Sequence, residues 1–160
     1  MKRIEGTSEV RLIECVNPVK GKWRIRWDVQ VNEDGTATYM EEEFMHKPTD
    51  MEIRQAIIGW HNRQTDEAIL SGFEYEGCMV WLSRENQFNY KAAYDLAVQT
   101  AGATLPVTFK LGTDETPVYK VFDNIEKLTE FYTKAMRYIQ ETLAIGWKKK
   151  DELDLALYEI

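Results

Sequence analysis

The chain is 160 residues long, 44% of its residues are hydrophobic, and its net charge at pH 7 is -7. This size and composition suit a folded domain that buries about two-thirds of the surface of its unfolded chain, and they argue against a disordered or fibrous protein. The negative charge makes nucleic acid an unlikely general partner, because non-specific affinity for it comes mainly from Lys and Arg.

The first strong pattern is an alternation of apolar and polar side chains over residues 22–31. It predicts a strand with Trp23 and Trp27 on its buried face and Arg24 and Arg26 on the other. A further strand is expected before it, at residues 9–16. After it, an Asn-Glu-Asp-Gly turn predicts an antiparallel partner over residues 36–45.

Charge and size matching predict the register of this hairpin. The expected cross-strand pairs are Val31 with Thr36, Trp27 with Met40, Arg26 with Glu41, Arg24 with Glu43 and Trp23 with Phe44. Glu42 is a misfit in this register, because it falls opposite Ile25 on the apolar face.

A helix is predicted to begin after Thr49, because Thr49 and Glu52 have the spacing of a capping box. Gly72 is its expected end. The polar residues 62–66 predict a break into two helices, with Thr65 capping the second.

A short hairpin follows, with residues 73–75 and 78–82 pairing around Glu76 and Gly77. Ser83 is the expected N-cap of the next helix, which ends near Gly102. The apolar stripe expected on this helix is Phe88, Ala92, Ala93, Leu96 and Ala97.

Two more strands are predicted at residues 106–111 and 117–122. Asp123 and Glu126 have capping-box spacing at the start of a last long helix, which is expected to end near Gly146.

These elements predict an α+β fold, in which an N-terminal antiparallel β hairpin or sheet is followed by alternating helices and β hairpins and by a long C-terminal helix. We expect one domain over residues 1–160. It has a β-rich subregion over residues 1–47 and a helix-and-hairpin subregion over residues 48–160. A short amphipathic tail, residues 151–158, either docks on this domain or mediates assembly.

The first residues lack the apolar core of a signal peptide, and no segment approaches the length of a membrane span. We therefore expect a cytoplasmic protein without membrane contact. Cys15 and Cys78 lie far apart among strand-like apolar neighbours, which predicts two reduced, buried thiols.

The sequence predicts no catalytic, cofactor-binding or metal-binding constellation, and so no enzyme. Ser83 follows a strand and opens a helix, as a nucleophile elbow does, but the flanking glycines of that motif are missing. A helix cap is the preferred interpretation. A small hydrolase centred on Ser83 is kept as an alternative.

Two aromatic surfaces suggest recognition. Met79 and Trp81 lie on the strand face opposite Val80 and form the candidate partner surface. The tryptophans of the first hairpin are interpreted as core residues. In the alternative interpretation they bind nucleic acid together with Arg24 and Arg26.

Residues 69–94 also carry a resemblance. Ile-Leu-Ser-Gly-Phe-Glu-Tyr-Glu-Gly, then a short strand, Ser-Arg-Glu-Asn-Gln and a helix rich in small residues, resemble a domain of unknown function found in bacteriophage and prophage proteins, often associated with tail or tail-fibre genes. The similarity runs from about Thr49 to about Asp154.

The resemblance implies a prophage-type structural or interaction protein with a tail accessory, assembly or adaptor role, and it supplies no catalytic residues. The partners it implies are phage structural proteins. We also expect a homo-oligomer. Its location would be the cytoplasm of the bacterial host or an assembled virion.

Overall fold

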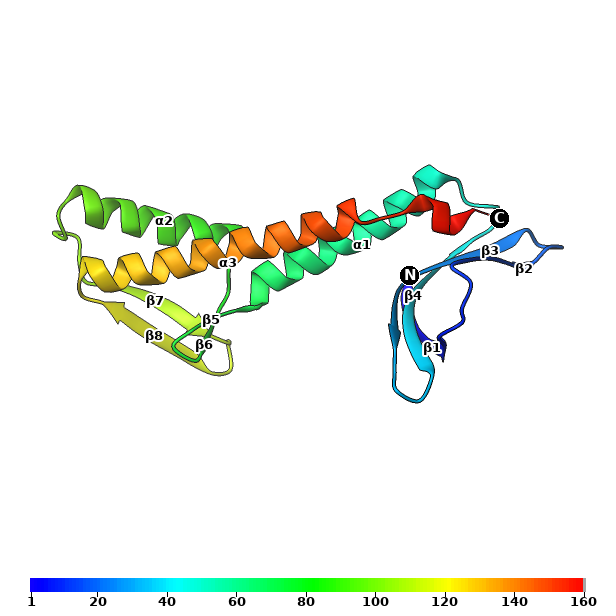
Figure 1. Ribbon diagram of the computed structural model, residues 1–160. Coiled ribbons are helices and arrows are strands. Elements are labelled where there is room, and N and C mark those ends of the chain that lie inside the picture. The colour runs from blue at the N-terminus through cyan, green and yellow to red at the C-terminus, as the bar shows by residue number, and fades with distance from the viewer. Residues whose placement is uncertain (160) are drawn as a thin grey trace. The chain divides into compact units, whose positions relative to one another are not determined.

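The computed structural model describes residues 1–159, and these residues form an α+β fold with eight strands and three α-helices (Figure 1). The predicted fold class is confirmed. The elements are β1 (Lys2–Thr7), β2 (Ile13–Asn17), β3 (Lys22–Val31), β4 (Thr36–Phe44), α1 (Asp50–Ser71), β5 (Phe73–Tyr75), β6 (Cys78–Val80), α2 (Arg84–Gln99), β7 (Val107–Gly112), β8 (Pro117–Phe122), α3 (Ile125–Asp151) and the 3-10 turn η1 (Leu155–Tyr158).

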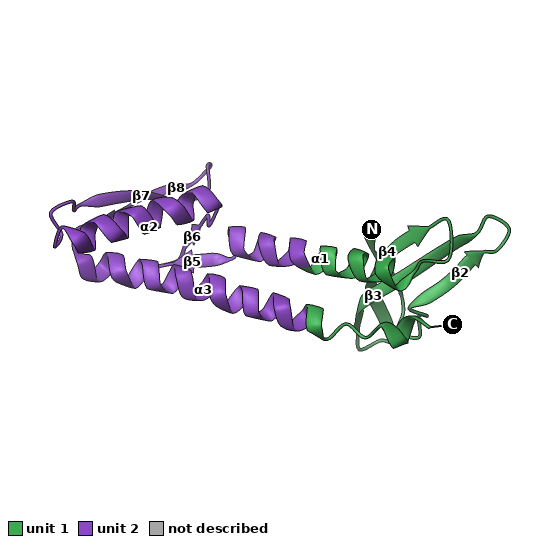
Figure 2. Cartoon of the chain, turned by 90° about the horizontal axis from the view of Figure 1, so that it is seen from above, with its two compact units in different colours: residues 1–61, 150–160 green, residues 62–149 purple. Residues whose placement is uncertain are grey.

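The chain divides into two compact units, coloured separately in Figure 2. Unit 1 combines residues 1–61 with the C-terminal residues from Lys150, and unit 2 is Asn62–Lys149. The division falls inside α1, whereas the sequence suggested a change of character between residues 47 and 48. The expectation of a single domain over residues 1–160 stays a prediction.

Unit 1 contains an antiparallel sheet in the order β1-β4-β3-β2. The sequence pattern did not predict β1. Its residues pair with β4 from Lys2 opposite Glu41 to Thr7 opposite Thr36, yet most of its side chains are exposed. Backbone hydrogen bonding rather than side-chain burial therefore holds this edge strand, and a hydrophobic pattern does not reveal such a strand.

The register of β3 and β4 follows the predicted charge matching over most of its length. The pairs Trp23 with Phe44, Arg24 with Glu43, Ile25 with Glu42, Arg26 with Glu41 and Trp27 with Met40 are confirmed. The misfit Glu42 carboxylate lies 2.7 Å from the amino nitrogen of Met1.

The predicted pairing of Val31 with Thr36 is wrong, because Val31 pairs with Ala37. The register shifts between Trp27 and Gln30, where Asp28 has a φ of 52°. One extra residue on β3 therefore forms a bulge, which ends the strict alternation that the sequence suggested.

The first half of α1 covers this sheet and forms the core of unit 1. Ile53, Ile57 and Trp60 pack in one cluster with Ile25 and Trp27. The apolar face of the helix thus packs against the apolar face of the sheet, as a layered α+β unit requires.

The capping box at the start of α1 is confirmed. The backbone N–H of Thr49 donates to Glu52 Oε2 at 2.8 Å, and the N–H of Glu52 donates to Thr49 Oγ1 at 3.3 Å. The predicted break at residues 62–66 is wrong, since α1 is continuous from Asp50 to Ser71. These polar residues include neither Gly nor Pro, and Arg and Gln are good helix formers.

The C-terminal tail docks on unit 1. Tyr158 in η1 is buried in the same cluster as Trp27. Its hydroxyl donates to the backbone carbonyl of Arg26 at 2.9 Å. Burial raises the pKa of the Tyr158 hydroxyl to about 12, because a buried phenolate would lose its hydration.

We expect this phenol to make stability depend on alkaline pH. The folded-state pKa lies above the ordinary value of about 10, so the unfolded chain loses the proton first and stability falls between about pH 10 and pH 12. The expected loss is about 2 to 3 kcal/mol. Urea unfolding of the native chain and of Tyr158→Phe across this range measures it. The variant corrects for other titrating groups, and parallel pH profiles for the two proteins would contradict the prediction.

Unit 2 is built around an aromatic core. The hairpins β5–β6 and β7–β8 contribute Tyr75, Phe109 and Phe122, and the helices α2 and α3 contribute Tyr90 and Phe131. The predicted β5–β6 hairpin is confirmed, with Phe73 opposite Val80 and Tyr75 opposite Cys78, but its second strand ends at Val80 and not at Leu82. Its turn residues Glu76 and Gly77 have φ values of 49° and 75°, as a tight two-residue turn requires.

Gly72 ends α1, as predicted, and the structure adds a reason. A Cβ atom at this position would lie 2.1 Å from the hydroxyl oxygen of Tyr138. That hydroxyl donates to the carbonyl of Ala68 at 2.7 Å. The absent side chain therefore lets a tyrosine of α3 cap the last turn of α1.

The predicted stripe of α2 is partly wrong. Phe88 is 70% exposed and Leu96 is also exposed, whereas Tyr90 and Ala97 are buried. Tyr90 lies about 200° further round the helix than Phe88, so the two side chains take opposite faces. Apolar residues lie on more than one face of this helix, so their spacing alone does not show which of them are buried.

Both predicted ends of α3 are wrong. Its cap is Asn124, whose Oδ1 accepts from the N–H of Lys127 at 2.9 Å, while Asp123 pairs with the side chain of Lys127. The helix continues through Gly146 to Asp151. A Cβ at Gly146 would lie 2.3 Å from Thr65 Oγ1, so this glycine permits close packing of α1 and α3 within unit 2.

The two cysteines are free, as expected, but each is half-buried rather than buried. Cys78 packs at the margin of the aromatic core of unit 2, and Cys15 lies on β2 opposite Trp23.

Candidate functional site

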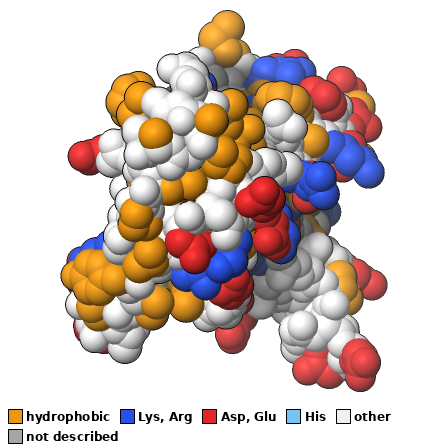
Figure 3. Space-filling model, turned by 90° about the vertical axis from the view of Figure 1, so that its left-hand side faces the viewer, with side chains coloured by type: hydrophobic (Ala, Val, Ile, Leu, Met, Phe, Trp, Pro, Cys, Tyr) orange, Lys and Arg blue, Asp and Glu red, His pale blue; other side chains and the backbone are white. Residues whose placement is uncertain are grey.

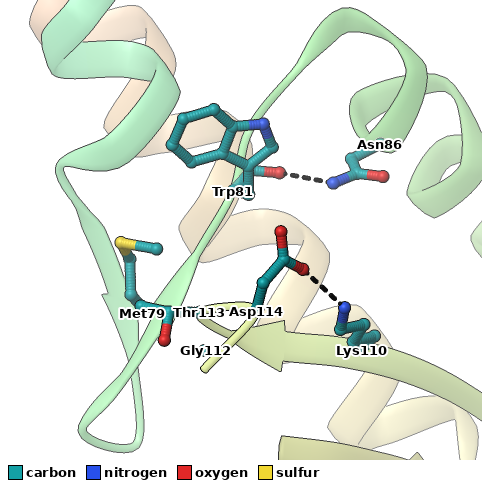
Figure 4. A pocket seen from close by; sticks show the side chains of 7 residues that line it. All are labelled: Met79, Trp81, Asn86, Lys110, Gly112, Thr113 and Asp114. Carbon is teal, nitrogen blue, oxygen red and sulfur yellow. Dashed lines mark hydrogen bonds and ion pairs between the residues drawn. The ribbon is translucent and has the colours of Figure 1, made fainter. Parts of the chain in front are cut away.

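The candidate partner residues Met79 and Trp81 lie together in one groove of unit 2, shown in Figure 4. The groove has a volume of about 470 Å³. Its lining residues are Met79, Trp81, Asn86, Lys110, Gly112, Thr113 and Asp114. We call it the Trp81 groove. It lies between the segment that leads from β6 into α2 and the end of β7 with the loop that follows (Figure 4).

Trp81 combines an exposed side chain with a fixed backbone. Its side chain is 44% exposed, while its carbonyl accepts from Asn86 Nδ2 at 2.8 Å. The next carbonyl, that of Leu82, accepts from Gln87 Nε2 at 2.7 Å, and the N–H of Leu82 donates to the carbonyl of Leu70 at 3.0 Å. The first turn of α2 and the end of α1 therefore hold Trp81 in place.

Ser83 is the N-cap of α2, as predicted. Its Oγ accepts from the backbone N–H of Asn86 at 3.2 Å. The hydroxyl thus satisfies a backbone donor that the helix itself leaves free.

The opposite wall of the groove carries a polar pair on an ordered turn. Lys110 Nζ lies 2.7 Å from Asp114 Oδ1, which raises the pKa of Lys110 and lowers that of Asp114 through their hydrogen bond and mutual charge. Thr113 Oγ1 accepts from the N–H of Thr116 at 3.0 Å. Gly112 has a φ of 80°, and a Cβ there would lie 2.3 Å from the carbonyl of Thr116.

The arginines of the alternative interpretation lie in unit 1 and are engaged with carboxylates. Arg26 is only 5% exposed. Its three guanidinium nitrogens lie 2.9 Å from Glu41 Oε2, Glu14 Oε2 and the carbonyl oxygen of Arg11. Arg24 is more exposed, with Nε 3.3 Å from Glu43 Oε2. Trp27, which this interpretation would need at the surface, is buried.

Sequence reasoning identified one wall of the Trp81 groove and missed the other. Lys110 and the turn residues 112–114 were assigned only to a strand and a loop. Their proximity to Trp81 comes from tertiary packing of β6 against β7, and no spacing in the sequence encodes it.

Within residues 1–159, no three His, Cys, Asp or Glu side chains are grouped so as to hold a metal ion. No helix in the same range has both the length and the apolar character needed to span a membrane.

Comparison with protein families gives a match. The model of a family described as a domain of unknown function, DUF4376, matches residues 52–160. The chain belongs to this family. The matched region contains the whole Trp81 groove, and it begins after the sheet of unit 1. Comparisons with curated proteins and with solved structures give no match.

Proposed function

We propose that this protein is a non-catalytic structural or interaction protein of prophage type, which binds a segment of a protein partner in the Trp81 groove. One observation carries the proposal. An exposed tryptophan is presented on a backbone that hydrogen bonds hold in place. The backbone that carries this side chain is already ordered, so binding requires no further ordering of it, and tryptophan is a frequent anchor residue in protein interfaces.

The chemistry of the groove indicates the kind of segment that fits. The indole of Trp81 and the thioether of Met79 offer an apolar, adaptable surface, and both residue types are enriched in protein interfaces. The Lys110 and Asp114 charges are paired with each other, so the polar wall carries no net charge. We infer that the bound segment presents an apolar or aromatic side chain beside neutral polar groups.

The phage setting rests on the resemblance of residues 69–94. In this proposal the protein has a tail accessory, assembly or adaptor role, and its partners are phage structural proteins. It acts in the host cytoplasm or as part of a virion. Tail or baseplate genes beside its own gene would support this setting, and replication genes there would count against it.

The two alternatives receive less support. Nucleic-acid binding through Arg24 and Arg26 would require Arg26 to leave three close partners in a buried site. Hydrolysis at Ser83 would require its hydroxyl to leave a helix cap.

We expect Trp81→Ala to weaken binding of a selected peptide at least about 30-fold, as loss of a central aromatic anchor does. The probe is the tightest peptide obtained from a random library selected against the native protein. Its dissociation constant is measured by isothermal titration calorimetry, and NMR follows the Met79 methyl group and the Trp81 indole N–H.

The matched control is Trp147→Ala. Trp147 is also exposed and lies in unit 2, but it does not line the groove. Its removal should leave peptide affinity within about twofold. Equal losses in both variants, or a selected peptide that leaves the Met79 and Trp81 signals unmoved, would reject the groove as the binding site.

A further inference from the structure

The hairpin β7–β8 of unit 2 ends in an unprotected strand edge. In the described residues, β8 is hydrogen-bonded to β7 on one side only. The pairing runs without a bulge from Val107 opposite Phe122 to Gly112 opposite Pro117. The backbone N–H and C=O groups on the other side of β8 are therefore available to another strand.

The devices by which proteins usually block such an edge are absent or neutralised on β8. Its proline, Pro117, is the first residue of the strand and leaves the remaining donors intact. Its one lysine, Lys120, forms an ion pair with Glu76 of the β5–β6 turn and lies 6.0 Å from the Tyr75 ring centroid. Lys120 is therefore held toward the β5–β6 turn, and the outer face of β8, with Pro117, Tyr119 and Val121, carries no charged side chain.

Apolar side chains are exposed along the same strand. Tyr119 is 66% exposed and Val121 is 52% exposed, and both point to the outer face of the hairpin, beside Lys110 and Thr108 of β7. Figure 3 shows hydrophobic side chains gathered at the end of unit 2 that contains α2, β7 and β8. An open edge with exposed apolar residues is typical of a surface that pairs with another strand.

We infer that a second copy of this chain pairs antiparallel with β8 and forms a continuous four-stranded sheet across a two-fold axis. Side chains opposite each other in such a pair must point to the same face. In a symmetric pair, one residue of β8 therefore lies opposite its own copy at the two-fold axis. The two registers that pair most of the strand place either Tyr119 or Lys120 at this central position. The second would place two lysines directly opposite each other, which is destabilising.

On the outer face, the register centred on Tyr119 matches apolar side chains with each other. Tyr119 meets its own copy on the outer face, and Val121 meets Pro117. On the inner face Val118 meets Lys120, whose charge is already paired with Glu76. One six-residue edge makes a small interface, so we expect a dimer that dissociates in the micromolar range.

The test measures the mass of the full chain by light scattering from about 1 µM to about 1 mM. The expected result is a rise from the 18.7 kDa of one chain toward twice that mass. Tyr119→Lys should raise the dissociation constant roughly tenfold or more, because it replaces an aromatic pair with facing charges. Thr108→Lys is the control, since it adds the same charge to the outer face on β7 and should leave dimerisation unchanged.

Oxidative cross-linking tests the register. Tyr119→Cys should form a disulfide between copies, because opposite Cβ atoms lie about 4.5 to 5.5 Å apart. Val121→Cys should form far less, and the unsubstituted chain reports any background from Cys15 and Cys78. A mass of one chain at all concentrations, a dimer insensitive to Tyr119→Lys, or equal cross-linking at both positions would overturn the inference. No residue of β8 lines the Trp81 groove, so Trp81→Ala should leave the dimer intact.

Discussion

We expect the replacement of Arg26 with methionine to lower the free energy of unfolding of unit 1 by about 3 kcal/mol. The substitution keeps most of the side-chain volume and removes the charge. Glu41, which is only 6% exposed, then loses the guanidinium that lies 2.9 Å from its Oε2. Glu14 loses a partner as well, but it remains more open to water.

The cost arises mainly from the carboxylate that remains. A buried carboxylate without a cation has lost its hydration and gained nothing in exchange. Breaking a buried pair usually costs about 3 to 5 kcal/mol, and we expect the lower end because Arg24 Nε stays 3.5 Å from Glu41 Oε1. Burial acts to lower the pKa of Arg26, but the hydrogen bonds and charges of Glu41 and Glu14 outweigh it and raise the pKa. The arginine is therefore charged at every pH at which the protein is folded.

Hydrogen-exchange mass spectrometry of peptides from β3 and β4 reports this loss for unit 1 alone. Arg24→Met is the control, because Arg24 is a third exposed and should contribute less than about 1 kcal/mol. The double variant Arg26→Met with Glu41→Leu should recover most of the stability, since no charge is then left buried. A loss as small as that of Arg24→Met, or a double variant weaker than the single one, would show that the pair is not a structural element of the core.

We expect the replacement of Phe131 with alanine to lower the free energy of unfolding of unit 2 by about 4 kcal/mol. Phe131 has no exposed surface and packs against four other aromatic rings of the core. Its ring centroid lies within 5.0 to 5.5 Å of those of Tyr75, Tyr90, Phe109 and Phe122. The alanine variant leaves a cavity that these neighbours, held on two hairpins and a second helix, fill only partly.

Phe88→Ala is the matched control for this loss. Phe88 is also a phenylalanine on a helix of unit 2, but it is 70% exposed, so its removal should change stability by no more than about 0.5 kcal/mol. Hydrogen exchange of amides in α3 and β5 distinguishes the two variants. Similar protection in both would mean that the aromatic cluster contributes little to the stability of unit 2.

Much of the fold could be predicted because local signals in this chain are strong. The capping box of Thr49 and Glu52, the Glu76-Gly77 turn and the Ser83 cap each depend on groups within a few residues of each other, so their chemistry is readable from sequence spacing. The β3–β4 register was also readable, since arginines and glutamates face each other across the strands.

Several of the errors fall where distant residues decide the structure. Gly146 looks like a helix end in sequence, but α3 continues through it, and Thr65 of α1 occupies the space that a side chain at this position would need. Strand β1 shows no clear pattern, because pairing with β4 rather than burial of its own side chains defines it. Phe88 and Tyr90 are both aromatic, and Phe88 is the more apolar of the two, yet packing around Phe131 buries Tyr90 and leaves Phe88 exposed.

The candidate site shows the same division. The sequence by itself predicted that Met79 and Trp81 point to the same side of the chain, because side chains alternate along an extended backbone. In the structure β6 ends at Val80, and both residues line the groove. The tertiary structure decided that Lys110 and residues 112–114 face them across a groove, and that Arg26 is buried among carboxylates instead of exposed for binding. Strand alternation and helix capping act over a few residues. Grooves and buried charges depend on which distant segments pack together, and that depends on the free energy of the whole fold.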